Sequence, residues 1–154
     1  MSERAFERKA WIFLLIVGAG LLLAAVLNGL SGHPLASGLG FVRGNLGIDW
    51  DELAATDPDV ARIVVAFTRM TMVFAFAYAV VFLVVIATGY RAGRRWAWWT
   101  AWSCPAVLLA YVAVGIAYDG WGPMSSWKFG FGWGFVGLAV LGLLLPMRRF
   151  FPRN

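Results

Sequence analysis

The chain has 154 residues, of which 61% are hydrophobic and 14% charged, and its formal net charge is +5. Its length bounds it to one domain, and its single cysteine excludes a disulfide framework and Cys-x-x-Cys redox chemistry. The single histidine excludes a haem held by two histidines of this chain. The positive charge is divided among short segments beside apolar runs, which favours contact with anionic lipid headgroups over nucleic acid as its role.

Four apolar runs without a single Asp, Glu, Lys or Arg dominate the sequence. A helix of about 20 apolar residues crosses the hydrocarbon core of a bilayer, and a spanning segment must satisfy its own backbone hydrogen bonds. The pattern therefore predicts an all-α integral membrane protein, an antiparallel four-helix transmembrane bundle forming a single membrane domain over residues 1–154. The predicted transmembrane helices cover residues 10–30, 70–88, 96–117 and 129–147.

The distribution of charge predicts the orientation of this bundle. Nine of the thirteen basic residues lie in the N-terminal arm, in the loop after the second run and in the C-terminal tail. Six of the eight acids lie in the other two loops. By the positive-inside rule both termini are cytoplasmic and the loop over residues 31–69 is extracellular. We expect a multi-pass protein of the inner (plasma) membrane, and the Arg, Ala, Gly and Val content suggests a prokaryotic source.

The predicted extracellular loop carries a helix start. Thr56-Asp-Pro-Asp combines N-cap residues, a proline in the first turn and acids near the positive end of the helix dipole. The second helix is therefore expected to begin near Asp57, outside the membrane, and to run to about Tyr90. The preceding Asp51-Glu-Leu-Ala-Ala segment is expected to form one or two helical turns.

Small residues and prolines predict how the helices pack and end. Small residues repeat along helices one, two and four, a spacing that lets membrane helices approach closely, either within the bundle or in a homo-oligomer or larger membrane complex. The stripes are Gly20, Ala24 and Asn28; Thr71, Ala75 and Ala79; and Gly130, Gly134, Gly137 and Gly142. Pro105 is expected to kink the third helix and Pro146 to end the fourth.

Counting residues along antiparallel helices places a group of polar side chains at one height, near the outer membrane edge. These candidate ligand-binding residues are Asn28, His33, Arg69, Tyr118 and Asp119, with an Arg69–Asp119 pair as one possible contact. The functional interpretation is a polar mouth above an apolar cavity. The alternative is that helix ends carry polar residues in any membrane protein and that arginine extends to the interface.

The sequence shows no motif of a known chemistry. Paired carboxylates, a nucleotide-binding loop and a cluster of metal ligands are lacking, so we expect no catalytic residue, metal or cofactor. Cys104 is interpreted as a packing residue, because His33 lies near the other face.

Two segments resemble a known group of proteins. Arg91-Ala-Gly-Arg-Arg-Trp-Ala-Trp-Trp and the ending Leu-Leu-Leu-Pro146-Met-Arg-Arg-Phe-Phe-Pro are similar to small four-helix prokaryotic membrane proteins of the DoxX-like kind. The resemblance covers the topology of most of the chain and implies no catalytic residues.

Two classes of function remain. The first is a non-enzymatic module that binds a lipid-like small molecule or a membrane partner, and the thin inventory of acids, bases and nucleophiles favours it. The alternative is a small membrane enzyme or oxidoreductase subunit acting on an apolar substrate at the outer mouth. An enzyme should bring polar groups together in a cavity, whereas a partner-binding module should leave small-residue faces open to lipid.

Overall fold

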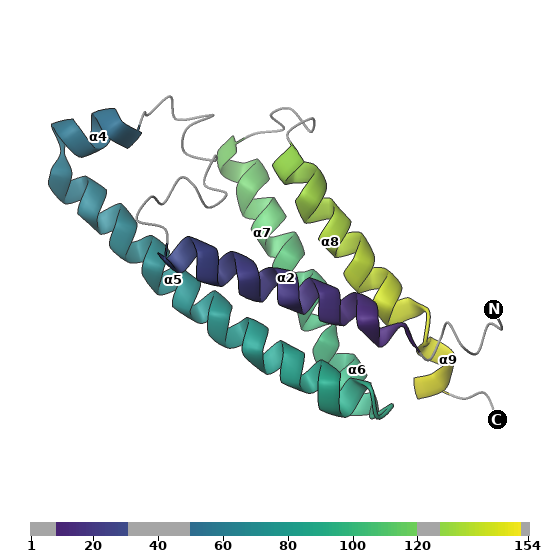
Figure 1. The fold of residues 1–154 in the computed structure, drawn as a ribbon. Coiled ribbons are helices and arrows are strands. Elements are labelled where there is room, and N and C mark those ends of the chain that lie inside the picture. The colour runs from purple at the N-terminus through teal and green to yellow at the C-terminus, as the bar shows by residue number, and fades with distance from the viewer. Residues whose placement is uncertain (1–8, 31–49, 120–126, 152–154) are drawn as a thin grey trace.

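The computed structural model describes residues 9–30, 50–119 and 127–151, and these residues form helices joined by turns, without a strand (Figure 1). The all-α prediction is confirmed. In chain order the elements are α2 (Trp11–Leu30), α4 (Trp50–Thr56), α5 (Pro58–Val85), the π-helix η1 (Ile86–Tyr90), α6 (Arg95–Ala101), α7 (Ser103–Asp119), α8 (Trp127–Leu144) and α9 (Met147–Phe150).

The predicted start of the second helix is confirmed. Asp57 is the N-cap of α5, and its carboxylate accepts a hydrogen bond from the Val60 amide at 3.2 Å, with Pro58 in the first turn. The helix continues through η1 to Tyr90, as expected. Gly93 then ends the turn with φ 75°, a left-handed backbone that glycine adopts without strain.

Two helices among the described residues are long and apolar enough to cross a membrane, Trp11–Leu30 and Pro58–Tyr90. Most of their side chains are not buried in the isolated chain, and Phe67, Val73 and Phe74 are exposed. Large exposed apolar surfaces of this kind favour contact with lipid over the core of a soluble domain.

Prolines shape the other two apolar runs. The third run is divided by a turn at Trp102 into α6 and α7, upstream of Pro105, which cannot donate a hydrogen bond to the Ala101 carbonyl. The expected bend is therefore a break in the helix. The fourth run ends as α8 at Leu144, just before Pro146, as predicted.

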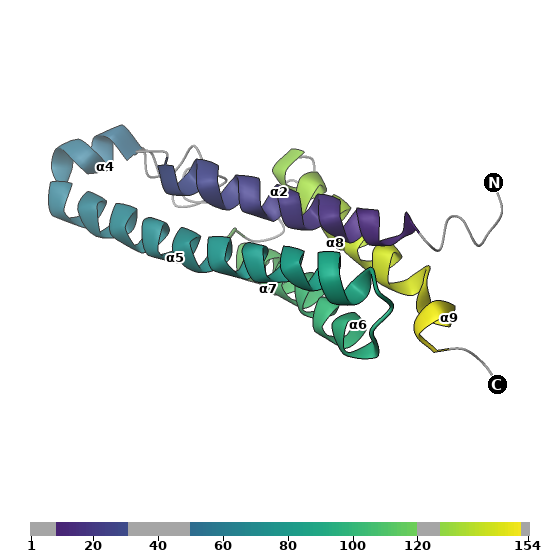
Figure 2. The same ribbon diagram turned by 60° about the horizontal axis from the view of Figure 1, so that its bottom comes forward.

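Helix α2 packs antiparallel against α5 in a constant register (Figure 2). A methyl group added to Gly18 would come within 2.7 Å of Leu83 Cδ2, and one on Gly29 would lie 3.6 Å from Met72 Cβ. Eleven residues separate the two contacts on each helix, so the helices stay in step over three turns.

The other side of α2 packs against α8, again through glycine. A methyl group on Gly20 would come within 2.6 Å of the Phe135 ring, and one on Gly142 within 2.9 Å of Leu14 Cγ. In contrast, the predicted stripes are not buried as units: Ala24 is exposed, and added methyl groups on Gly134 and Gly137 would meet no atom within 4 Å. The small residues of α8 therefore face both the bundle and its outside.

Side chains from η1 and α6 donate hydrogen bonds to carbonyl groups at the C-terminal end of α8. Pro146 has no N–H, and the helix stops at Leu144, so the last carbonyls of α8 lack their usual partners. The Tyr90 hydroxyl donates to the Gly142 carbonyl at 2.6 Å, and the Trp98 indole donates to the Leu143 carbonyl at 3.0 Å. Both hydrogen bonds are buried, so these two carbonyl groups are satisfied without water.

The two ends of the molecule carry opposite charge. At one end the Arg91 guanidinium lies 5.3 Å from the Trp11 ring centroid, and Arg95 Nε donates to the Phe150 carbonyl at 3.0 Å. These contacts gather the start of α2, the Arg91–Arg95 segment and the end of α9. At the opposite end α4 and the start of α5 carry the acids Asp51, Glu52, Asp57 and Asp59 (Figure 1).

Candidate functional site

The structure describes only some of the predicted site residues. His33 lies outside the described residues, and so do the side chains of Tyr118 and Asp119, although their backbone forms the end of α7. The Arg69–Asp119 pair therefore stays a prediction. Asn28 is half-buried in the last turn of α2, and Arg69 is exposed on α5.

Asn28 and Arg69 do lie at a similar height. Gly29 is level with Met72, since their Cβ positions would be 3.6 Å apart. Arg69 is one turn further out on α5 and Asn28 is one residue further in on α2, so the two differ by roughly 6 Å along the helix axes. This spacing is compatible with the predicted outer polar layer.

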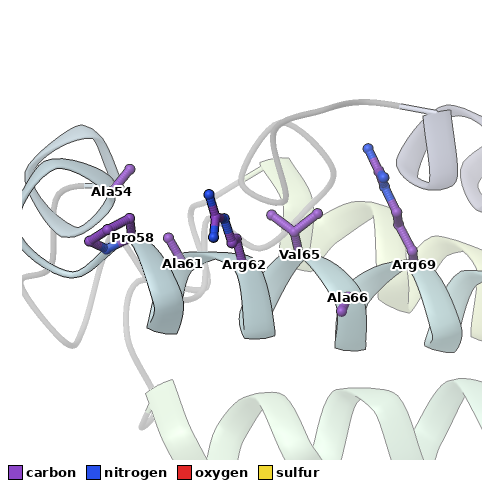
Figure 3. Close-up of a pocket in the computed structure, with 7 residues that line it drawn as sticks. All are labelled: Ala54, Pro58, Ala61, Arg62, Val65, Ala66 and Arg69. Carbon is purple, nitrogen blue, oxygen red and sulfur yellow. The ribbon is translucent and has the colours of Figure 1, made fainter.

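Arg69 lines a hollow of about 540 Å³ between α4 and the first three turns of α5 (Figure 3). Arg62, Val65 and Arg69 extend from α5 toward the same side. The spacing of the α5 residues, three, four or seven positions apart, places them on one helix face. The described residues that line it are Ala54, Pro58, Ala61, Arg62, Val65, Ala66 and Arg69.

Small side chains create the space. Ala61 is buried where α4 folds back on α5, and alanine or proline occupies four of the seven lining positions. Alanine leaves room beside a helix that a leucine would fill. Val65 lies between the two arginines and is the largest apolar group of the lining.

The two charged residues of the lining are both arginines. Arg62 Nη1 lies 3.4 Å from Asp59 Oδ1, but both side chains are more than 80% exposed, at 83% and 84%, so water weakens this pair. No hydrogen bond or ion pair within the described residues holds the Arg69 side chain. Asp57 is directed instead at the Val60 amide. The hollow therefore offers positive charge above an apolar surface.

The side chains of this lining are suited to holding a ligand that has an anionic group and an apolar part. Guanidinium groups recognise phosphate or carboxylate through two parallel hydrogen bonds, and the alanine, proline and valine side chains offer apolar contact. None of the seven lining residues is a nucleophile or a general base.

Sequence reasoning identified Arg69 but missed Arg62 and the alanines. The signal was present, because Arg62 and Arg69 are seven residues apart and share a face with Ala61 and Val65. What the sequence did not reveal was that α4 folds back to form the other wall.

Elsewhere in the described bundle, a pair of polar side chains forms a hydrogen bond between helices, and a buried thiol and a buried indole N–H lie outside the hollow. The Tyr78 and Ser103 hydroxyls lie 2.9 Å apart and link α5 to the start of α7. Cys104 is buried, and the buried Trp102 indole N–H has no partner. No group of three or more His, Cys, Asp or Glu side chains in the described residues could hold a metal ion.

Comparison with family models, curated proteins and solved structures finds no match to this chain. The resemblance to DoxX-like proteins therefore stays a prediction, and any proposal of function has to stand on the structure.

Proposed function

We propose that this protein is a multi-pass inner-membrane protein that crosses the bilayer four times, with both termini cytoplasmic, and binds a lipid-like small molecule without transforming it. The segregation of charge supports the orientation: arginines gather at the end that holds the start of α2 and the end of α8, and acids gather on α4 and α5.

The observation that carries the binding proposal is the hollow at Arg69. It combines positive charge, an apolar lining and a position at the outer edge of a helix that is long enough to span a membrane. Ligand sites are commonly concave and apolar, with a few polar groups that fix orientation.

Topology is tested by cysteine labelling from outside the cell. In a Cys104→Ala background, a cysteine placed at the exposed Ala55 of α4 should react with a membrane-impermeant maleimide. A cysteine at the exposed Ala92, in the opposite turn, should react only after permeabilisation. The reverse pattern would refute the proposed orientation.

Binding is tested by native mass spectrometry of the full chain purified in mild detergent with a polar-lipid extract. The wild-type chain should retain a lipid adduct, and Val65→Trp, which fills the hollow, should lose it. Ile63→Trp is the matched control, since Ile63 is exposed outside the lining. Equal adducts in wild type and Val65→Trp, or no adduct in either, would refute the binding proposal.

The open face of α8 supports a second proposal, a homo-oligomer or larger membrane complex. Gly134 and Gly137 are exposed, and an added methyl group on either would meet no atom of this chain within 4 Å. Glycine lets a second membrane helix approach closely. A Gly137→Val variant that leaves the mass of the detergent-solubilised assembly unchanged, while the wild type is oligomeric, would exclude this face.

A further inference from the structure

We infer that the hollow recognises the phosphate of a glycerophospholipid through Arg69, assisted by Arg62, with the acyl chains lying along α5 toward the membrane interior. This inference rests on the proposed lipid-binding function and specifies its ligand class.

The depth of Arg69 is the first argument. After Arg69, the 21 residues from Met70 to Tyr90 contain no Asp, Glu, Lys or Arg, and Arg91 follows. At 1.5 Å per residue this segment is ~31 Å long, close to the thickness of the hydrocarbon core. Arg69 is therefore at the level where phospholipid headgroups begin, and Arg91 is at the same level of the opposite leaflet.

The charge of the lining is the second argument. Arg62 and Arg69 border the hollow, and none of the described residues that line it carries a carboxylate. Asp59, which is three residues before Arg62 and ten before Arg69, forms an exposed and weak ion pair with Arg62. A phosphate group can accept two parallel hydrogen bonds from one guanidinium, which a hydroxyl or an amine cannot do.

The surface below Arg69 is the third argument, and it favours a lipid over a free anion. Val73 and Phe76 lie one and two turns inward from Arg69 on the same helix face, and both are exposed. They give an acyl chain an apolar track that starts at the arginine, whereas Val65 and Ala66 lie on the other side of Arg69, inside the hollow. Inorganic phosphate would use the guanidinium groups alone.

The order of groups along α5 matches that of a phospholipid in the outer leaflet. Acids come first at Asp57 and Asp59, the arginines follow at Arg62 and Arg69, and the run without charged residues comes last. A lipid placed here has its headgroup in water, its phosphate at the arginines and its chains in the membrane.

The test is a titration of the full chain in detergent, read by native mass spectrometry, with lipids that share two oleoyl chains. The probes are phosphatidylglycerol, phosphatidylcholine and diacylglycerol, which has no phosphate. Both phospholipids should bind about tenfold more tightly than diacylglycerol, the effect expected of a hydrogen bond to a charged group.

Substitutions assign this preference to the hollow. Arg69→Gln should remove the tenfold preference, and Arg69→Lys should keep part of it, because lysine supplies charge without the paired donors. Arg94→Gln is the matched control, since it removes one exposed arginine from the opposite end. Circular dichroism should show the same helix content in all variants.

The other outcomes separate the inference from the function on which it rests. Equal binding of diacylglycerol and phospholipids, lost in Val65→Trp, would overturn phosphate recognition and leave lipid binding in place. Binding of no lipid would overturn both. Displacement of phospholipid by millimolar inorganic phosphate would show that the site recognises a free anion, and would overturn the lipid assignment.

Discussion

The two ends of the bundle are built by opposite means. At the arginine-rich end, η1 and α6 insert aromatic side chains against α8 and satisfy its last carbonyls with buried hydrogen bonds. At the acidic end, α4 folds back on α5 over small side chains and leaves a hollow. Large side chains fill the arginine-rich end, whereas alanine side chains leave space for the hollow at the acidic end. We therefore expect stability to depend mainly on the arginine-rich end and the proposed binding to depend on the acidic end.

Helix termination explains part of this difference. Pro146 leaves carbonyls of α8 without their helical donors, and these carbonyls are buried, so they need partners from other helices. Asp57 instead caps α5 at an exposed position, where a side-chain carboxylate is sufficient. The buried end therefore requires long-range contacts between helices, whereas the exposed end is satisfied locally.

The largest expected effect is at the closed end. Trp98→Ala should lower the free energy of unfolding by about 3–5 kcal/mol, because it leaves a cavity and removes the donor to the Leu143 carbonyl. Unfolding by SDS, followed by circular dichroism in mild detergent, measures it. Trp99→Ala, at a 64% exposed neighbour, is the control and should cost about 1 kcal/mol or less. Equal losses would contradict the assignment of stability to the buried indole.

A smaller change isolates the hydrogen bond from the packing. Tyr90→Phe keeps the ring beside Phe150 but leaves the Gly142 carbonyl without its donor. The expected loss is about 1–3 kcal/mol of unfolding free energy, since a buried acceptor stays unsatisfied. Tyr111→Phe, at an exposed tyrosine, should change stability by less than about 0.5 kcal/mol in the same measurement. A Tyr90 variant as stable as the wild type would show that another donor reaches this carbonyl.

Gly20 of α2 lies against α8, whereas a methyl group added to Gly137 of α8 would meet no atom within 4 Å, so the same substitution can be compared at a packed and an open position. Gly20→Val should destabilise the chain by about 1–3 kcal/mol, because its Cβ would lie 2.6 Å from the Phe135 ring, which must move. Gly137→Val meets open space and should leave the monomer as stable as before within about 0.5 kcal/mol. The same SDS titration measures both. Comparable destabilisation by the two substitutions would mean that the exposed face of α8 is covered by something other than lipid.

The helix ends that depend on neighbouring residues were predicted correctly from the sequence. Thr56-Asp-Pro-Asp located the start of α5, and Pro146 located the end of α8, since caps and prolines act on the residues beside them. The uncharged run was predicted to end at Thr88, and the helix that contains it ends two residues later, at Tyr90.

Features that depend on contacts between distant residues were not predictable from the sequence. The π-helix at Ile86–Tyr90 adds a residue to a turn, and α6 then folds so closely over Gly89 that an added methyl would lie 2.6 Å from Trp96. The hollow likewise needs α4 to turn back at Asp57, and the sequence shows a helix start there without the angle between the two helices. Arg69 could be predicted as a site residue from its position along the helix, but Arg62 could not be predicted in this way.

The smallest expected effect concerns the exposed Arg62–Asp59 ion pair at the open end. Removing this pair should slightly lower stability and slightly strengthen lipid binding. Asp59→Asn removes an acid from the first turn of α5, where a negative charge interacts with the helix dipole, and should lower unfolding free energy by at most about 1 kcal/mol. The same change frees Arg62 and should tighten phosphatidylglycerol binding by less than about fivefold, since an exposed pair contributes about 0–1 kcal/mol. Glu52→Gln removes an equal charge from α4, away from Arg62, and should affect binding less. Salt near 1 M should abolish the gain, because it shortens the screening length to about 3 Å. If Asp59→Asn weakened binding instead, Asp59 would be holding Arg62 in its binding orientation, and the hollow would be more ordered than its exposure indicates.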